Sequence, residues 1–317
     1  LENPVKTELS CFNWYQAIDD YKQMTATTAG IRGRERLIAP IKFIWNYAGN
    51  CLTNQHGGIN QMHPILLDDK KCETIVVIDT TLTPSARYAD FLLPSCLNLE
   101  EHDWTSDGDS NIAYVIFDNK CIEPLGEAKS IYDICAGVAN ELGVKEAFTE
   151  GRTQYQWLEK LYAESRKAIP ELPPTLEEAY TMGVYKRDFP ENHIAYKAFR
   201  DDPEANPLPS PSGKIEIYSP RLAELAETWT LLPGQAITAL PEYIPNPEGA
   251  ISPERKEWPL QLIGHHYKQR THSTYGNCWW LQEVAPQELW INPIDAKARG
   301  IEFGDRVKVF NGRGVSF

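Results

Sequence analysis

The fold is decided by the sequence IKFIWNYAGN at residues 41–50 and by TIVVIDTTLTPSARYADFLLP at residues 74–94. Both contain short, nearly continuous apolar runs with many β-branched residues, which are typical of strands covered on both faces of a parallel sheet. The three predicted strands, residues 41–45, 74–78 and 91–94, each end in small or polar residues. Because ligands bind at the carboxyl edge of open α/β sheets, we expect the strand ends to converge on one binding crevice.

The segment between the first two strands predicts a helix that completes a strand–helix–strand unit. A glycine-rich turn at residues 55–61 leads into this helix, which we place at residues 62–69. Such units cross over right-handedly and build parallel sheets. After Asp79, Thr83 can cap a helix start and Pro84 suits the first turn. The predicted fold class is therefore α/β, a Rossmann-like parallel sheet with flanking helices.

The first two of three predicted segments differ in composition. Residues 1–148 form the Rossmann-like α/β domain, whose clearest helix covers residues 130–143 and ends in glycine. Residues 149–254 form a connecting segment, in which an amphipathic helix over residues 157–168 is followed by extended, Pro-rich chain. Within that chain, residues 212–219 alternate like a strand. We expect this segment to wrap a surface and not to form a core of its own.

The third segment, residues 255–317, predicts the start of a small β-barrel domain. We expect strands at residues 260–263, 288–291 and 306–310. A barrel is the natural closure of several short strands. Asn292 can cap a short helix that Gly300 closes. Because Phe317 directly follows a hairpin signal, we expect this barrel to be cut short.

The composition argues against several classes of protein. The net charge of −13, from 44 acidic and 31 basic residues, opposes nucleic-acid binding, which depends on neutralising phosphates. No apolar run approaches the roughly 20 residues of a membrane-spanning helix, so we expect no direct span. The seven cysteines contain no C-x-x-C pair, which disfavours zinc and iron–sulfur sites and favours reduced core thiols. The chain begins without methionine or a signal sequence, so we expect a mature or excised piece.

The strand ends supply the first candidate binding residues. Asp79 could accept hydrogen bonds from a guanine edge or a ribose hydroxyl, or it could be an ordinary cap or turn aspartate. Gly49 lets the backbone approach a ligand and Asn50 offers a donor and an acceptor, although the pair could also form a plain turn. Glu100 and Glu101 do not suit acid–base hydrolysis, because adjacent side chains diverge on an extended backbone.

A second polar cluster, HHYKQRTHST, occupies residues 265–274 after a predicted strand. Its arginine offers a bidentate fork for phosphate and its hydroxyl groups add donors, so the cluster suits an anion. Zinc is disfavoured because no fourth ligand lies nearby and the histidine spacing is not helical. A solvated polar loop remains the alternative. The sequence has no phosphate-loop, G-x-G-x-x-G or G-x-S-x-G motif.

Three motifs become informative in combination. They are W-N-Y-A-G-N at residues 45–50, V-V-I-D-x3-T-x-S-A-x2-A-D-x-L-L-P at residues 76–94 and L-E-E-x-D at residues 99–103. Together they resemble the molybdopterin-dependent oxidoreductases of the dimethyl sulfoxide reductase family, above all the catalytic subunits of its membrane-associated anaerobic members. The resemblance covers all 317 residues, as an interior or C-terminal portion of a longer subunit.

The resemblance implies a function and its cofactors. The chain would be part of a catalytic subunit that carries bis-molybdopterin guanine dinucleotide and reduces S-oxides or N-oxides by oxygen-atom transfer at molybdenum. Electrons would come from an iron–sulfur subunit and a membrane anchor subunit, on the periplasmic side of the bacterial inner membrane. The family's 4Fe-4S cysteines and its Ser or Cys molybdenum ligand would lie in earlier sequence. We therefore expect no catalytic residue or metal ligand in this chain, and no activity from the chain alone.

The resemblance also assigns cofactor contacts to positions at the strand ends, in the helix at residues 130–143 and in the last segment, which would be a molybdopterin-dinucleotide-binding barrel. These positions are Gly49, Asn50, Asp79, Thr83, Glu101, Asp133, His266, Arg270, His272, Ser273, Thr274 and Asn292. Two alternatives remain open: a non-catalytic guanine-nucleotide-binding module that uses the crevice at Asp79, and a structural domain that mediates assembly. A hydrolase is disfavoured because no nucleophile–base set is visible.

Overall fold

The computed structural model describes residues 4–54, 58–106, 113–189, 191–192, 194–231, 233–312 and 314–316. The chain divides into two compact units, Leu1–Glu216 and Ile217–Phe317. Each unit is described by itself. The division into residues 1–148, 149–254 and 255–317 stays a prediction.

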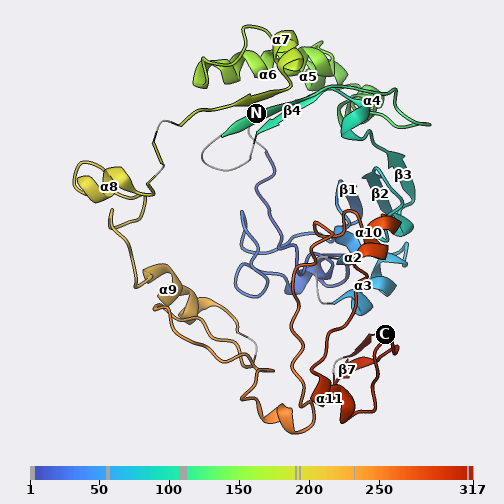
Figure 1. The fold of residues 1–317 in the computed structure, drawn as a ribbon, viewed down its shortest axis with the longest axis vertical. Coiled ribbons are helices and arrows are strands. Elements are labelled where there is room, and N and C mark those ends of the chain that lie inside the picture. Colours follow the sequence, from blue (N-terminus) through green and yellow to red (C-terminus); the bar gives the residue numbers. More distant parts are fainter. Residues whose placement is uncertain are drawn as a thin grey trace. The chain divides into compact units, whose positions relative to one another are not determined.

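A three-stranded parallel sheet lies in the first unit, with its strands in the order β1, β2, β3 (Figure 1). The strands are β1 (Phe43–Tyr47), β2 (Thr74–Asp79) and β3 (Phe91–Pro94). The connections contain α2 (Cys51–Asn54), α3 (Ile59–Leu66) and the 3-10 helix η2 (Ser85–Tyr88). The three predicted strands are confirmed, and α3 begins and ends three residues before the predicted helix. Residues 55–57 of the predicted glycine-rich turn lie outside the described residues.

The sheet forms because its central strand is apolar on both faces. Val77 and Ile78 of β2 are fully buried. Burial of one such side chain stabilises the folded state by roughly 1.5–3 kcal/mol, so β2 contributes strongly to the stability of the parallel sheet. The buried residues of its core cluster are Tyr15, Ile18, Leu52, Met62, Ile65, Leu66, Cys72, Ile75, Val77 and Ala86. Tyr47 pairs with Ile78 and Asp79 with Pro94, so the three strands end together at one edge.

An antiparallel sheet and further helices complete the first unit. The sheet contains β4 (Asp103–Ser106), β5 (Tyr114–Asp118) and β6 (Val184–Lys186). The helices are α1 (Gln16–Asp19), η1 (Tyr21–Gln23), η3 (Asn98–Glu100), α4 (Ile131–Glu141), α5 (Lys145–Thr149), α6 (Gln154–Ala168), α7 (Leu176–Met182) and α8 (Lys197–Asp201). Helix α4 confirms its prediction: the Ser130 side chain caps it, and Gly143 ends it with φ +70°. Helix α6 buries Tyr162 but leaves Leu161 exposed.

The second unit has short helices and one hairpin. Its elements are α9 (Pro220–Thr228), η4 (Pro253–Lys256), α10 (Trp279–Val284), α11 (Pro293–Lys297), β7 (Val309–Asn311) and β8 (Gly314–Ser316). Helix α11 forms where predicted, because Asn292 Oδ1 accepts a hydrogen bond from Ile294 N at 2.9 Å. The strands predicted at residues 212–219, 260–263 and 288–291 are wrong. Among the described residues, these three segments have no neighbouring strand to which their backbones could hydrogen-bond, and a strand needs such a neighbour. The barrel stays a prediction.

Two predictions from composition can be compared with the structure. Within the described ranges, no helix is both long enough and apolar enough to cross a membrane. All seven cysteines are free, but only Cys72 is buried. The expectation of core thiols is therefore wrong for the other six, because their side chains lie in loops, at element ends or on partly exposed helix faces.

Candidate functional site

Hydrogen bonds of the buried Asn46 side chain stabilise the loop after β1. Asn46 is buried, its Nδ2 donates to Gly49 O at 2.7 Å, and its Oδ1 accepts from Cys51 Sγ at 2.7 Å. Ala48 takes φ +48°, a left-handed conformation that only the surrounding contacts stabilise in a residue with a Cβ. These contacts fix the backbone of Gly49 at the carboxyl edge of the sheet.

Asn50 connects this loop to the one after β2. Its Oδ1 accepts from Ser85 Oγ at 2.7 Å, from Ser85 N at 3.0 Å and from Thr53 Oγ1 at 3.2 Å. Ser85 is completely buried and Thr53 is 5% exposed. The Asn50 oxygen is thus occupied within the protein, and only its Nδ2 is left to donate to a ligand. Asn50 therefore holds the two loops together and has no free acceptor for a ligand.

Asp79 and Thr83 lie at the end of β2. Asp79 Oδ1 accepts from Thr80 N at 2.8 Å, whereas Oδ2 accepts no hydrogen bond from any described residue. Thr83 Oγ1 accepts a hydrogen bond from Ala86 N of η2 at 3.2 Å, but the N-cap position itself is Pro84 and carries no side-chain cap. One carboxylate oxygen of Asp79 therefore remains for a ligand, while the Thr83 oxygen is engaged in local structure.

A cavity of about 290 Å³ in the first unit brings two predicted residues together. Glu101, which follows η3, and Asp133, in the first turn of α4, both line it. The neighbouring Glu100 is only 3% exposed, and its two oxygens accept from Leu97 N and Leu125 N, each at 2.8 Å. Glu100 is thus a structural carboxylate, and Glu101 is the one available to a ligand.

Both carboxylates and amines line this cavity: Glu100, Glu101 and Asp133 lie beside Lys120 and Lys129. Burial raises the pKa of Glu101, and the charges of Asp103 and Asp133 raise it further. Burial together with Glu101 and Asp103 also raises the pKa of Tyr47 at the end of β1. The end of β1 and the cavity at Glu101 therefore share one acidic environment. Carboxylate oxygens in this environment suit the edge of a ligand that presents hydrogen-bond donors.

The loop around Arg270 forms a second cavity, of about 280 Å³, in the second unit. The Arg270 guanidinium lies over the Tyr267 ring at 5.3 Å, and both residues line the cavity. Arg270 Nε and Tyr267 Oη are buried but have no hydrogen-bond partner among the described residues. His272 and Tyr275 take φ +55° and +70°, so the loop turns tightly. Since buried polar atoms are nearly always satisfied, this donor set fits an anionic group such as phosphate.

The remaining predicted residues lie apart from the walls of either cavity. His266, His272, Ser273 and Thr274 are exposed. Asn292 is also exposed, and its Oδ1 caps α11. Most lining residues were not predicted, among them Gln154, whose Nε2 donates to Glu101 Oε2 at 2.9 Å, and Tyr267. No local pattern marks Gln154, because it lies 53 residues from its partner.

Metal ligation is not visible in the described part of the chain. There, no group of three or more His, Cys, Asp or Glu side chains could hold an ion. What the two cavities offer is hydrogen bonding: carboxylate acceptors in the first unit, and arginine and tyrosine donors in the second. Taken separately, the first cavity suits a group that donates hydrogen bonds, and the second suits an anionic group such as phosphate.

Comparisons with known proteins agree with this chemistry. A family model described as molybdopterin oxidoreductase matches residues 22–141, and one described as molybdopterin dinucleotide binding domain matches residues 260–316. Dimethyl sulfoxide reductase DmsA of Escherichia coli (strain K12) is 54% identical over 99% of this chain and 39% of its own length. Trimethylamine-N-oxide reductase of Salmonella typhi is 31% identical over 93% of this chain and 36% of its own length.

A solved structure shows the fold alone. Acetylene hydratase from Pelobacter acetylenicus superimposes with a TM-score of 0.65 over 92% of this chain and 34% of its own chain, at 21% identity. The α/β fold, the cavities and the two matched family models together define a molybdopterin-binding protein. The chain belongs to the molybdopterin oxidoreductases of the dimethyl sulfoxide reductase family. It spans about 39% of the length of the curated relatives to which it is most similar here.

Proposed function

We propose that this chain is part of the catalytic subunit of a bis-molybdopterin guanine dinucleotide reductase that reduces S-oxides or N-oxides. Relatives named dimethyl sulfoxide reductase and trimethylamine-N-oxide reductase support this substrate class. The net reaction consumes two electrons and two protons, and it converts the oxide into a sulfide or amine and water. When bound, the molybdenum cofactor supplies this oxygen-atom transfer, and the residues of this chain bind and orient its nucleotide ends.

The observation that carries the proposal is the loop at Arg270. Within the segment that matches the dinucleotide binding domain, the buried Arg270 Nε lacks a hydrogen-bond partner in the described part of the chain. A buried guanidinium donor without an acceptor costs free energy, and a phosphate oxygen is the acceptor that suits it best. Arg270 and Tyr267 would therefore hold a phosphate or pyrophosphate of the cofactor.

Two carboxylates of the first unit with an oxygen left to accept support the guanine form of the nucleotide. A guanine edge presents the N1–H and the exocyclic amine side by side, and a carboxylate accepts two such bonds well. Asp79 Oδ2 and Glu101 Oε1 each accept no hydrogen bond from a described residue. We assign guanine recognition in this cavity to Glu101, with Asp133 on the same cavity wall, and keep Asp79 at the end of β2 as a separate candidate.

The source of electrons lies outside the chain in this proposal. The resemblance to the membrane-associated members supports an iron–sulfur partner subunit, a membrane anchor subunit and a periplasmic location. A 4Fe-4S cluster and the molybdenum ligand would be held by sequence that precedes residues 1–317 in the longer subunit. The isolated 317-residue chain would then be inactive, and measurable reductase turnover by it would contradict the proposal.

The test uses the native-length protein purified without oxygen. Molybdenum and acid-released guanine nucleotide are measured per polypeptide, and oxide-dependent oxidation of a reduced dye is measured in parallel. We expect two guanine nucleotides for each molybdenum, a sharp loss of both in Arg270→Ala, and no change in the control Arg299→Ala, which removes an exposed arginine paired with Asp295. Nucleotide without molybdenum would favour the non-catalytic binding module. Absence of both would overturn the proposal.

A further inference from the structure

The cavity at Glu101 in the first unit is completed by a helix that neither family model covers. Gln154 is the first residue of α6, and it lies outside both matched segments. Its Nε2 donates a hydrogen bond to Glu101 Oε2 at 2.9 Å, and both side chains line the cavity. Tyr155 and Leu158 from the same helix line it too. The start of α6 is therefore a wall of the candidate nucleotide site.

Glu101 needs this hydrogen bond because its neighbours repel it. Burial raises its pKa most, and the charges of Asp103, Asp133 and Glu100 raise it further, whereas the hydrogen bond from Gln154 lowers it. Without that donor the carboxylate would take up a proton more readily or rotate away from the other acids. Gln154 thus opposes both changes at the residue proposed to bind guanine.

The first turn of α6 is itself held firmly. Gln156 N donates to Thr153 Oγ1 at 3.3 Å, and Gln156 Oε1 accepts from Thr153 N at 2.9 Å, which makes a reciprocal capping box. Trp157 Nε1 donates to Thr149 O at 3.1 Å, which ties the same turn to α5. Gln154 therefore projects from a backbone with little freedom to move, which is what a positioning residue requires.

We infer that Gln154 is a positioning residue for the nucleotide end of the cofactor: it holds Glu101 Oε2 so that Oε1 stays free to accept an N–H of the guanine edge. This inference rests on the proposed function, because it presupposes that guanine lies at Glu101. It goes further in one respect, since it assigns part of the nucleotide site to a helix beyond the matched segments. The alternative is a structural link between α6 and the chain after η3.

Three substitutions in the native-length enzyme separate these roles. Gln154→Ala removes the donor, Gln154→Glu adds a like charge, and Gln154→Lys restores a donor of similar reach. Guanine nucleotide per polypeptide and the thermal unfolding temperature are measured for each variant. Glu164→Ala, on the exposed face of the same helix and paired with Lys167, is the matched control.

We expect the alanine variant to lose about half or more of its nucleotide, in line with loss of a charge-assisted hydrogen bond, and the glutamate variant to lose more. The lysine variant and the control should retain the wild-type content, and the unfolding temperature should not follow the nucleotide content. The inference is overturned if Gln154→Ala keeps its nucleotide, if lysine is as defective as alanine, or if nucleotide loss follows unfolding. A wild-type enzyme without guanine nucleotide overturns the proposed function, and the inference with it.

Discussion

At the scale of single residues, two adjacent glutamates have opposite environments. Glu100 is buried and both its oxygens accept backbone N–H groups, so its negative charge is satisfied by the fold. Within the described residues, Glu101 accepts one hydrogen bond, from Gln154, and it has acidic neighbours. A carboxylate kept where its charge is unfavourable is more characteristic of a binding site than of a structural contact.

This contrast predicts a pH-dependent effect of Glu101→Gln on stability. The pKa of Glu101 is raised above its ordinary value of 4.5 in the folded protein, so ionisation costs folding free energy. Between the ordinary pKa and the raised pKa of Glu101, the native state binds more protons than the unfolded state. The contribution of Glu101 to the free energy of unfolding therefore falls as the pH rises through this range. We expect the glutamine variant to be more stable than wild type at pH 7 and equal to it near about pH 4.

Urea unfolding of wild type and Glu101→Gln is measured from about pH 4 to pH 7. The prediction concerns the difference between their free energies of unfolding at each pH. Glutamine can still accept the hydrogen bond from Gln154, so the substitution removes the charge but keeps the contact. A glutamine variant that is less stable than wild type at neutral pH would show that the Glu101 charge supports the fold.

Asn50 gives a second prediction at this scale. Its Oδ1 accepts from Ser85 N, Ser85 Oγ and Thr53 Oγ1, and these partners are buried. Asn50→Ala leaves buried donors without that acceptor, which should lower the free energy of unfolding by about 1–3 kcal/mol. Asn50→Asp keeps an oxygen in the same place and is the control. Equal stability of the alanine variant and wild type in urea unfolding would contradict this role.

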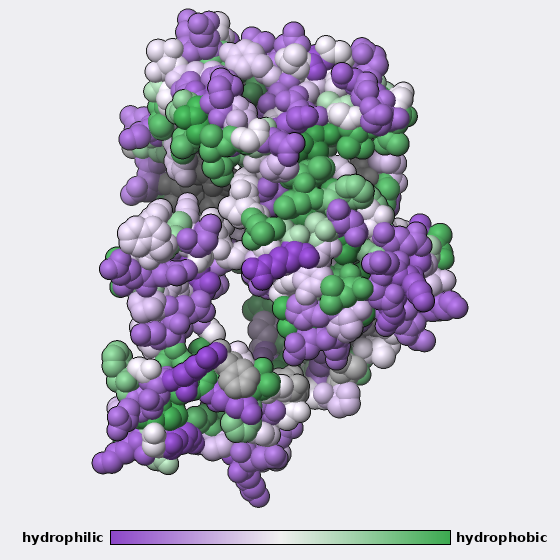
Figure 2. Space-filling model, turned by 90° about the vertical axis from the view of Figure 1, so that its right-hand side faces the viewer, coloured by the Kyte–Doolittle hydropathy of each residue, from purple (hydrophilic) through white to green (hydrophobic). Residues whose placement is uncertain are grey.

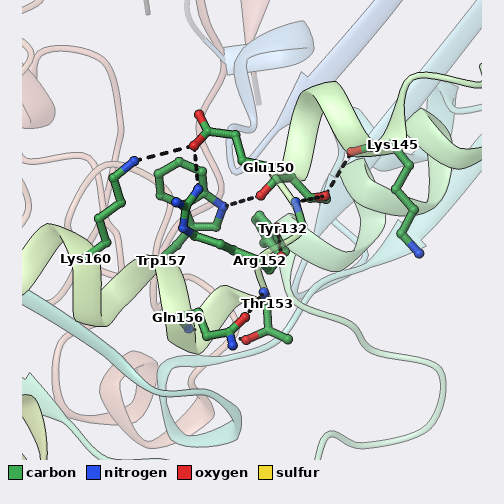
Figure 3. Close-up of polar contacts among 10 residues, drawn as sticks. Tyr132, Lys145, Glu150, Arg152, Thr153, Gln156, Trp157 and Lys160 are labelled. Atoms are coloured by element: carbon green, nitrogen blue, oxygen red, sulfur yellow. Dashed lines mark hydrogen bonds and ion pairs between the residues drawn. The ribbon is translucent and has the colours of Figure 1, made fainter.

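At the scale of elements, helices α4, α5 and α6 are joined around Trp157. The Arg152 guanidinium lies 5.0 Å and the Lys160 ammonium 4.4 Å from the Trp157 ring centre. Glu150 pairs with both cations, and Tyr132 of α4 donates to Arg152 O (Figure 3). The ring thus connects the end of α5 to the first turns of α6, next to the turn that carries Gln154.

Removing this ring should loosen the connection between these helices. We expect Trp157→Ala to lower the free energy of unfolding by about 3 kcal/mol, because a partly buried aromatic ring and its cation contacts are lost. Trp157→Phe keeps a smaller ring and loses the hydrogen bond from Nε1 to Thr149 O, so it should cost less than the alanine substitution, about 1–2 kcal/mol. Urea unfolding followed by circular dichroism gives both values. A phenylalanine variant as unstable as the alanine variant would assign the effect to the hydrogen bond instead.

The elements also show what could be predicted from sequence. Strands β1, β2 and β3 and helix α4 were predictable because local patterns and caps determine them: a continuous apolar run, a serine N-cap, a glycine at the helix end. Strands predicted at residues 260–263 and 288–291 did not form, because a strand depends on its neighbour and no local signal reports one.

In the candidate site, too, residues marked by a local sequence pattern could be predicted, and residues whose role depends on long-range contacts could not. Asp79 and Glu101 could be placed at strand and loop ends from the pattern of apolar runs. The roles of Asn50, which bonds to Ser85 across 35 residues, and of Gln154, which bonds to Glu101 across 53, could not. Contacts between residues so far apart in the sequence are determined by the tertiary fold, and they cannot be predicted from composition or periodicity.

At the scale of the whole molecule, burial is very unequal between the two units. Every buried hydrophobic residue, as far as the structure describes the chain, belongs to the first unit, from Tyr15 to Tyr180. Large apolar side chains of the second unit are exposed, including Trp290 at 80% and Phe303 at 98%. Apolar residues are also visible as green areas on the face drawn in Figure 2. The second unit therefore has little hydrophobic burial to offset the entropy of ordering its backbone.

This inequality predicts different resistance to proteolysis in the 317-residue chain. Cleavage requires a segment to open locally, and opening is cheapest where few apolar groups are buried. With a protease of broad specificity at low concentration, we expect the first cuts within residues 217–316 and a product that retains the parallel sheet of the first unit. Mass spectrometry of the early fragments locates the cuts, and the same digestion in urea is the control that shows which sites the protease accepts. Early cuts within β2 or α4, at rates equal to those in the second unit, would mean that apolar burial does not determine where this chain opens.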